Sequence, residues 1–342
     1  MVRDEHLKSL FRAFSEGCDS TFLRVAETII SDELAANHHG LANELRKAIS
    51  QRCAPHLSRP VRRELASMPK DRRNGEPLIS LQEGGVSQDQ IILNDETRKK
   101  IERILEEHRK SKQLADHGYR AKNKILFWGP PGCGKTFTAR YVAHELGKHI
   151  GIIRLNAVIS SFLGDTASHI QRVFDLATSS PMVLLLDEVD AVAKDRDDPN
   201  DVGELKRVVN SLLQAMDFFL STQSLIIAAS NHQYLLDPAA WRRFDDIVHF
   251  PMPGKDEREQ HLRLLLNGVE FNGSFAHLAK MLHGISFADV EHITIDAVKT
   301  MILQGKRKLS SNIIIKEYRA FKRDITSAMR KSRKAAGKEI DQ

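Results

Sequence analysis

The chain has 342 residues, of which 41% are hydrophobic and 28% are charged, and it carries a net charge of +6. These values are ordinary for a soluble globular protein of about two or three domains, and a basic balance of this size admits acidic partners without requiring nucleic acid. No apolar run approaches the ~20 residues needed to cross a bilayer, and the three distant cysteines lack the spacing of a zinc site, so we expect a cytoplasmic protein without a membrane partner.

The first predicted unit covers residues 1–58 and is a small helical module, which we interpret as a docking element. Leu7, Phe11 and Phe14 fall on one face of its first amphipathic helix. Residues 59–90 then combine prolines, glycines and arginines that break any long element, and they predict a mobile linker.

From residue 91 onward, apolar strands alternate with helices. After a helix that carries Ile101 and Leu105, strands are expected at Ile125–Trp128, Ile152–Asn156, Met182–Asp187, Leu225–Ser230 and Ile247–Phe250. The helices between them are expected at Thr136–Leu146, Ala167–Ala177 and Gly203–Phe219. Nearly continuous apolar strands separated by helices predict an α/β domain, residues 91–252, whose parallel sheet is covered by helices on both faces.

Beyond Pro251 and Pro253 the pattern becomes helical. Helices are expected at Asp256–Leu266, Phe275–Leu282, Asp289–Leu303 and Ile313–Arg333. Residues 253–342 therefore predict a separate helical lid domain. Its last helix collects lysines and arginines, which form either a solvated face or a contact for nucleic acid.

The most informative motif is GPPGCGKT, which follows the first predicted strand and opens a predicted helix. This GxxxxGK[ST] pattern in that setting is a phosphate-binding loop, because glycines let the backbone fold round an anion at the positive end of a helix. The lysine reaches the β- and γ-phosphates, and the threonine hydroxyl coordinates Mg²⁺. The predicted nucleotide-binding residues are Gly129, Pro130, Pro131, Gly132, Cys133, Gly134, Lys135 and Thr136.

Polar side chains end two further buried strands, where open α/β sheets bind their ligands. Asp187 ends the run VLLLD and is expected to coordinate Mg²⁺ through water, as Thr136 does directly. Glu188 is expected to polarise the water that attacks the γ-phosphate. Asn231 follows the strand LIIAAS and is expected to orient the same water and to sense the γ-phosphate.

The order of these motifs carries a resemblance. GPPGCGKT, LLLDEVDAVAKDR, GELKRVVNSLLQAMD, AASN and WRRFD, followed by a helical lid, resemble the AAA family of ATPases, within the AAA+ class, over about residues 91–305. The resemblance implies a P-loop NTPase fold, ATP and Mg²⁺ held between the α/β domain and the lid, hydrolysis to ADP and phosphate, and a ring-shaped homo-hexamer.

The resemblance also implies roles for residues outside the pocket. Arg243, and Arg242 in place of a second arginine, would act on the ATP of a neighbouring subunit. Phe162, Leu163 and Gly164 match a loop that grips a polypeptide in the central pore. The family often has Gly where this chain has Phe287, which departs from the usual nucleotide contact.

Three functions follow as alternatives. The first is an ATP-driven protein remodeller or unfoldase acting on a protein client, the second is a nucleic-acid loader or motor, and the third is a nucleotide-switched scaffold. The N-terminal segment LRVAETIISDELAANHHGLANELRKAI also resembles small bacterial ATPases that are paired with a subtilisin-like serine protease in plasmid-borne or phage-defence systems. This second resemblance implies that the chain regulates or feeds a separate protease.

Overall fold

The structure is a computed structural model that describes residues 77–153, 166–189, 211–219, 223–231 and 241–339, together with the single residues 28, 69 and 221. The chain divides into two units, Met1–Ser67 and Met68–Gln342. The predicted helical module, residues 1–58, lies almost entirely outside the described residues, as does most of the predicted linker. No helix in the described part of the chain is long and apolar enough to cross a membrane.

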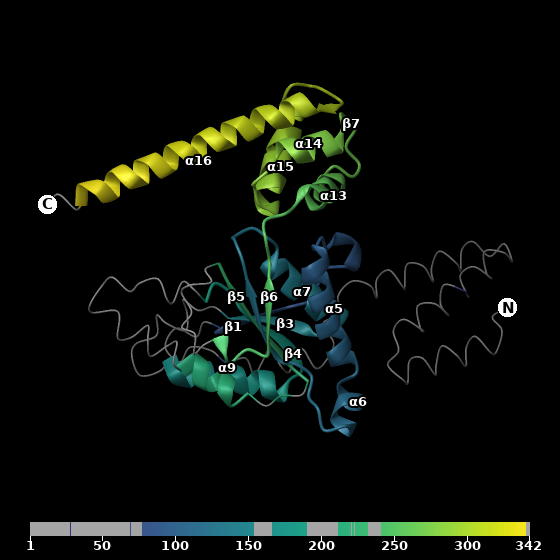
Figure 1. Ribbon diagram of the computed structural model, residues 1–342, viewed down its shortest axis with the longest axis vertical. Helices are drawn as coiled ribbons and strands as arrows, with labels where there is room; N and C mark the ends of the chain where they lie inside the picture. The colour runs from purple at the N-terminus through teal and green to yellow at the C-terminus, as the bar shows by residue number, and fades with distance from the viewer. Residues whose placement is uncertain are drawn as a thin grey trace, which may run out of the picture. The chain divides into compact units, whose positions relative to one another are not determined.

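Six strands of the described residues form the central sheet, in the order β1-β3-β4-β5-β2-β6 (Figure 1). The strands are β1 Ile79–Gln82, β2 Lys124–Trp128, β3 His149–Ile153, β4 Met182–Leu186, β5 Leu225–Ser230 and β6 Asp246–His249. All neighbours pair in parallel except β1, which runs antiparallel to β3. The predicted parallel sheet is confirmed, with an antiparallel edge strand added.

Strand β1 corrects the predicted linker. It lies inside the range 59–90, yet it pairs with β3 from Ile79↔Ile153 to Gln82↔Ile150, and Leu78 and Ile79 are completely buried. Strand β3 also begins three residues earlier than the strand predicted from Ile152, since its pairing with β4 starts at His149↔Met182.

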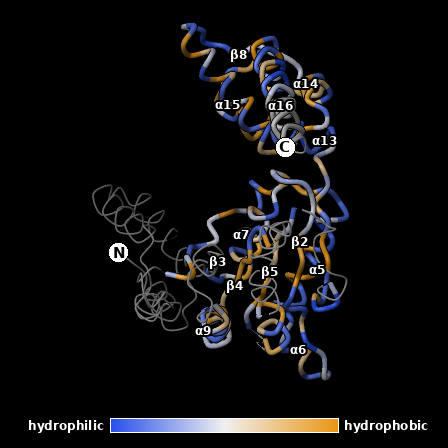
Figure 2. The backbone as a smooth tube through the Cα atoms, turned by 90° about the vertical axis from the view of Figure 1, so that its left-hand side faces the viewer, coloured by the Kyte–Doolittle hydropathy of each residue, from blue (hydrophilic) through white to orange (hydrophobic). Residues whose placement is uncertain are grey.

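Helices cover both faces of the sheet, as predicted. The helices around the sheet are α5 Asp95–Arg109, α6 Ser111–Asp116, α7 Lys135–Glu145 and α9 Thr166–Ser179, with a 3-10 turn η1 Gln88–Gln90 and a helical segment at 211–217. Successive strand residues alternate between two cores: Leu126 packs with the side chains of α9, and Phe127 packs with those of α5 and α7. Hydropathy colouring shows that the strands of the sheet, between these helices, are apolar (Figure 2).

The lid has a core of its own, built from Leu262, Leu278, Val290 and Ile314. Its helices are α13 Lys255–Leu265, α14 Phe275–Met281, α15 Phe287–Leu303 and α16 Ser311–Glu339 (Figure 1). The predicted helical character of the region after residue 253 is confirmed. The structure adds two short paired strands, β7 Phe271–Asn272 and β8 Leu309–Ser310, which the sequence pattern does not predict.

The sheet register determines where the polar strand ends meet. Leu186 of β4 pairs with Ala228 of β5, and Ser230 of β5 pairs with Trp128 of β2. Because the three strands are parallel neighbours, the residues that follow them lie at one edge of the sheet. Gly129, Asp187 and Asn231 therefore converge on the same region.

Candidate functional site

The loop between β2 and α7 uses glycine where no other residue fits. Gly129 has a φ of 149° and Gly132 a φ of 72°, in the region that favours glycine. A Cβ on Gly129 would lie 2.1 Å from the carbonyl oxygen of Phe250, and a Cβ on Gly132 would lie 2.5 Å from Oγ of Ser286. The backbone is thus closely packed on its outer side, at the N-terminal end of α7, where helix geometry favours an anion.

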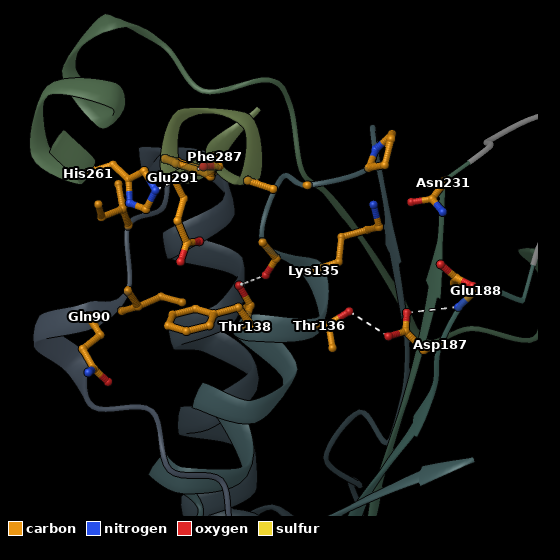
Figure 3. Close-up of a pocket in the computed structure, with 17 residues that line it drawn as sticks. Gln90, Lys135, Thr136, Thr138, Asp187, Glu188, Asn231, His261, Phe287 and Glu291 are labelled. Atoms are coloured by element: carbon orange, nitrogen blue, oxygen red, sulfur yellow. Dashed lines mark hydrogen bonds between the residues drawn. The ribbon is translucent and has the colours of Figure 1, made fainter. Parts of the chain in front are cut away.

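Two polar side chains of α7 face the centre of the loop. Lys135 is 7% exposed, and its Nζ donates to the carbonyl oxygens of Gly129 at 2.7 Å and Pro130 at 2.9 Å. Oγ1 of Thr136 donates to Oδ2 of Asp187 at 2.8 Å (Figure 3). A buried lysine beside a hydroxyl–carboxylate pair fits a Mg²⁺-bound polyphosphate, because Mg²⁺ takes hard oxygen ligands and lysine neutralises phosphate charge.

Backbone hydrogen bonds fix the turn that carries the acidic residues Asp187 and Glu188. Glu188 has a φ of 51°, a left-handed conformation that costs non-glycine residues on the order of 1–3 kcal/mol. Oδ1 of Asp187 accepts from the Glu188 amide at 3.0 Å, and the Val189 amide donates to the carbonyl oxygen of Ala229 at 3.1 Å. This turn leaves the Glu188 side chain exposed, on the same side of the site as Asn231 (Figure 3).

A cavity of about 380 Å³ joins these groups, which is within the range of small-molecule sites. The α/β domain and the lid both line it, and the Ala288 amide of the lid donates to the carbonyl oxygen of Gly132 at 3.2 Å. The lining residues are Gln90, Ile91, Ile92, Pro131, Gly132, Gly134, Lys135, Thr136, Phe137, Thr138, Asp187, Glu188, Asn231, His261, Phe287, Ala288 and Glu291.

Most of the predicted nucleotide residues lie on this cavity, and Gly129 and Pro130 lie behind it as acceptors for Lys135. Cys133 is the exception. Its side chain is 3% exposed, lines a separate cavity of about 250 Å³, and places Sγ 3.7 Å from Sδ of Met252. Burial raises the pKa of the Cys133 thiol, so this side chain packs behind the loop as a neutral group.

The two predicted arginines do not line the cavity of their own chain. Arg242 is exposed, whereas Nε of Arg243 donates to both carboxylate oxygens of Asp217, at 3.0 and 2.9 Å. The predicted pore residues Phe162, Leu163 and Gly164 lie outside the described residues.

Sequence reasoning pointed to the lid segment around Phe287 but missed several other residues that line the cavity. These residues are Ile91, Phe137, His261 and Glu291, which come from four separate segments. The sequence offered one clue to these residues, namely Phe287 at a position where the AAA family often has glycine. His261 and Glu291 lie beside Phe287 through the packing of α13 and α15.

Comparison with known proteins also identifies this region as an ATPase domain. The family described as "ATPase family associated with various cellular activities (AAA)" matches residues 125–252. An uncharacterized AAA family ATPase of Sinorhizobium fredii is 34% identical over 309 residues, which cover 90% of this chain and 92% of that protein.

Two other relatives match over the ATPase region. A proteasome-activating nucleotidase of Thermococcus onnurineus is 31% identical over 63% of this chain, and the match spans 55% of the nucleotidase. The ATP-dependent zinc metalloprotease FtsH of Mesoplasma florum is 32% identical over 67% of this chain but is matched over 36% of its own length. Because the Sinorhizobium relative is matched over nearly its whole length, the chain belongs to the AAA family of ATPases, and its reaction is the hydrolysis of ATP with Mg²⁺.

Proposed function

We propose that the chain is an ATP-driven protein remodeller of the unfoldase type that works as a homo-hexameric ring. The observation that carries the proposal is the shared cavity, in which the lid contacts the phosphate loop through Ala288 and Ser286. Hydrolysis of a nucleotide bound beside Gly132 would therefore alter its contact with the lid. The resulting movement of the lid could exert force on a client. Relatives whose names join ATP to proteasome activation or to proteolysis support a protein client.

The residues of the cavity divide the chemistry between them. Lys135 would exchange its carbonyl partners for phosphate oxygens when ATP binds. Thr136 directly and Asp187 through water would hold Mg²⁺, which would supply charge neutralisation at the β- and γ-phosphates. The Glu188 carboxylate accepts a proton from the attacking water as that water's oxygen bonds to the γ-phosphorus and the bond to ADP breaks. Asn231 orients this water by hydrogen bonding.

In the proposed ring, a neighbouring subunit supplies the positive charge that the γ-phosphate still needs. Arg243, with Arg242, acts on the ATP of the neighbouring subunit, where a guanidinium stabilises charge on the transferred phosphoryl group. Their position outside the cavity of their own chain supports a role in trans.

The client is gripped by the loop of Phe162, Leu163 and Gly164 and is selected by the module of residues 1–58. The resemblance of that module supports a separate subtilisin-like serine protease as partner, with the ring feeding or regulating it in bacterial phage defence. A cytoplasmic location belongs to the same proposal.

A nucleic-acid function is the second candidate, and α16 favours it. Arg319, Lys322 and Arg323 are exposed on this helix, and basic exposed helices bind phosphate backbones. A passive scaffold has less support, because Asp187, Glu188 and Asn231 meet in one cavity with Lys135.

A trapping experiment separates these functions. The Glu188→Gln variant keeps the shape of the site but lacks the proton acceptor, so it should bind ATP without turning it over. Material captured by the ATP-bound variant should be protein, and its recovery should fall when Phe162→Ala is added. Capture of nuclease-sensitive material with no protein would favour the nucleic-acid function, and undiminished hydrolysis would remove Glu188 from its role.

A further inference from the structure

The cavity has a second functional end that the phosphate chemistry does not use. Lys135, Thr136 and Asp187 lie toward one end, and His261, Phe287 and Glu291 lie toward the other (Figure 3). The walls of the cavity as a whole include the apolar side chains of Ile91, Ile92, Phe137 and Phe287. When the triphosphate occupies the glycine loop, the nucleoside half of the nucleotide must lie between these walls.

The position of Glu291 relative to the phosphate loop is well defined. It lies one helical turn after Phe287 on α15, and the start of that helix is anchored to the loop by the Ala288–Gly132 hydrogen bond. A reciprocal cap strengthens the same turn, because Oγ of Ser286 accepts from the Asp289 amide at 3.2 Å and the Asp289 carboxylate accepts from the Ser286 amide at 3.0 Å.

His261 joins α13 to the same turn. Its Nε2 donates to the carbonyl oxygen of Phe287 at 3.2 Å, and its ring meets the Phe287 ring edge-on at 5.1 Å. These contacts fix the position of α13, which carries His261, relative to α15, which carries Glu291.

Glu291 lacks a hydrogen-bonding partner among the described residues. Its side chain is exposed, and it makes no ion pair or hydrogen bond there, whereas Asp187 accepts from Thr136 and Asp289 accepts from Ser286. An ionised carboxylate can only accept hydrogen bonds. A carboxylate that lines a ligand cavity in this way is matched by a ligand with hydrogen-bond donors.

We propose that Glu291 accepts hydrogen bonds from the nucleoside half of the bound nucleotide and so determines which nucleotides the chain prefers. Two groups of ATP supply such donors, namely the ribose hydroxyls and the exocyclic amino group of the base. The inference rests on the binding of ATP in this cavity, which is part of the proposed function, and it does not depend on the nature of the client.

The test measures binding by full-length protein in the Glu188→Gln background, so that no nucleotide is consumed. Dissociation constants are compared for ATP, 2′-deoxy-ATP, 3′-deoxy-ATP and purine riboside triphosphate, each of the last three lacking one hydrogen-bond donor of ATP. A hydrogen bond to a charged group changes affinity by about tenfold to a hundredfold, so the chain should prefer ATP by that factor over at least one analogue. In Glu291→Ala this preference should fall to nearly one, and the affected analogue identifies the donor.

Asp296→Asn is the matched control, because it removes a carboxylate from the same helix outside the cavity. This variant should keep every preference of the parent. Equal binding of all four nucleotides by the parent, or unchanged preferences in Glu291→Ala, overturns the assignment. Failure of the parent to bind ATP overturns the proposed function as well, whereas ATP binding without client processing overturns the proposed function and leaves the role of Glu291 standing.

Discussion

Gly132 is the residue at which the phosphate loop and the lid touch. Its φ of 72° is the kind that only glycine adopts without strain, and a Cβ there would lie 2.5 Å from Oγ of Ser286 and 3.0 Å from Cβ of Ala288. Two separate requirements therefore select glycine, namely the backbone conformation of the loop and the close approach of α15.

These two requirements can be separated by substitution. Gly132→Ala should weaken ATP binding by tenfold or more, because the new methyl group displaces α15 and the anchored turn that lines the cavity. Gly118→Ala is the control, since Gly118 has a similar φ of 80° and no atom within 4 Å of the added Cβ. Both variants should lose about 1 kcal/mol of stability from backbone strain, measured by denaturant unfolding. Equal ATP affinity in the two variants would contradict the steric role of Gly132.

At the scale of elements, the buried His108 and the half-buried His261 join helices to their neighbours. Nε2 of His108, on α5, donates to the carbonyl oxygen of Lys122 at 2.7 Å, just before β2, and His261 joins α13 to α15. Burial lowers the pKa of both rings, and it outweighs the opposing effect of their carbonyl partners. Both rings therefore favour the neutral form in the folded protein.

This direction predicts how stability depends on pH. A histidine whose folded pKa lies below its ordinary value of about 6.5 contributes stability that is present above pH 6.5 and is lost as pH falls through the folded pKa. The melting temperature of the nucleotide-free protein should therefore fall between pH 7.5 and pH 5.5. In the double variant His108→Gln/His261→Gln this fall should be smaller, while exchange of the exposed His117 for Gln should leave it unchanged. An equal fall in all three proteins would assign it to other groups.

Elements that depend on local pattern were predictable, and those that depend on tertiary pairing were not. The apolar runs of β2, β4 and β5 are long enough to be recognised directly, and Gly134 and Lys135 mark the start of α7. Strand β1 was missed because only four residues form it between Pro77 and Gly84, and its partner is β3.

The same distinction holds for the site. Lys135, Thr136 and Asp187 belong to motifs whose spacing carries the chemistry, so the sequence predicted the cavity residues at the phosphate end. Glu291 and His261 belong to no motif, and their place in the cavity depends on how α13 and α15 pack against the phosphate loop. The orientation of the Cys133 side chain could not be predicted either. Its motif specifies the backbone of the loop but not the side of the loop on which the thiol packs.

At the scale of the whole molecule, the proposed ring predicts that each subunit completes the ATP site of its neighbour. Its own cavity contains Lys135 as the phosphate-facing cation, while Arg243 is held by Asp217 outside that cavity. Rings of identical subunits use the same head-to-tail contact throughout, so an arginine outside one cavity can serve the next.

Mixing two inactive variants tests this arrangement. Arg243→Ala subunits keep Glu188 but cannot serve a neighbour, whereas Glu188→Gln subunits lack the proton acceptor but still offer Arg243. Each variant alone should lose most of its ATPase activity, by a factor of about 10³ or more for the arginine. In a random one-to-one mixture, about a quarter of the contacts pair an intact Glu188 with an intact Arg243, so about a quarter of the wild-type rate should return. Wild-type protein carried through the same dissociation and mixing controls for losses in assembly. A mixture no more active than the sum of its parts would mean that each subunit completes its own site.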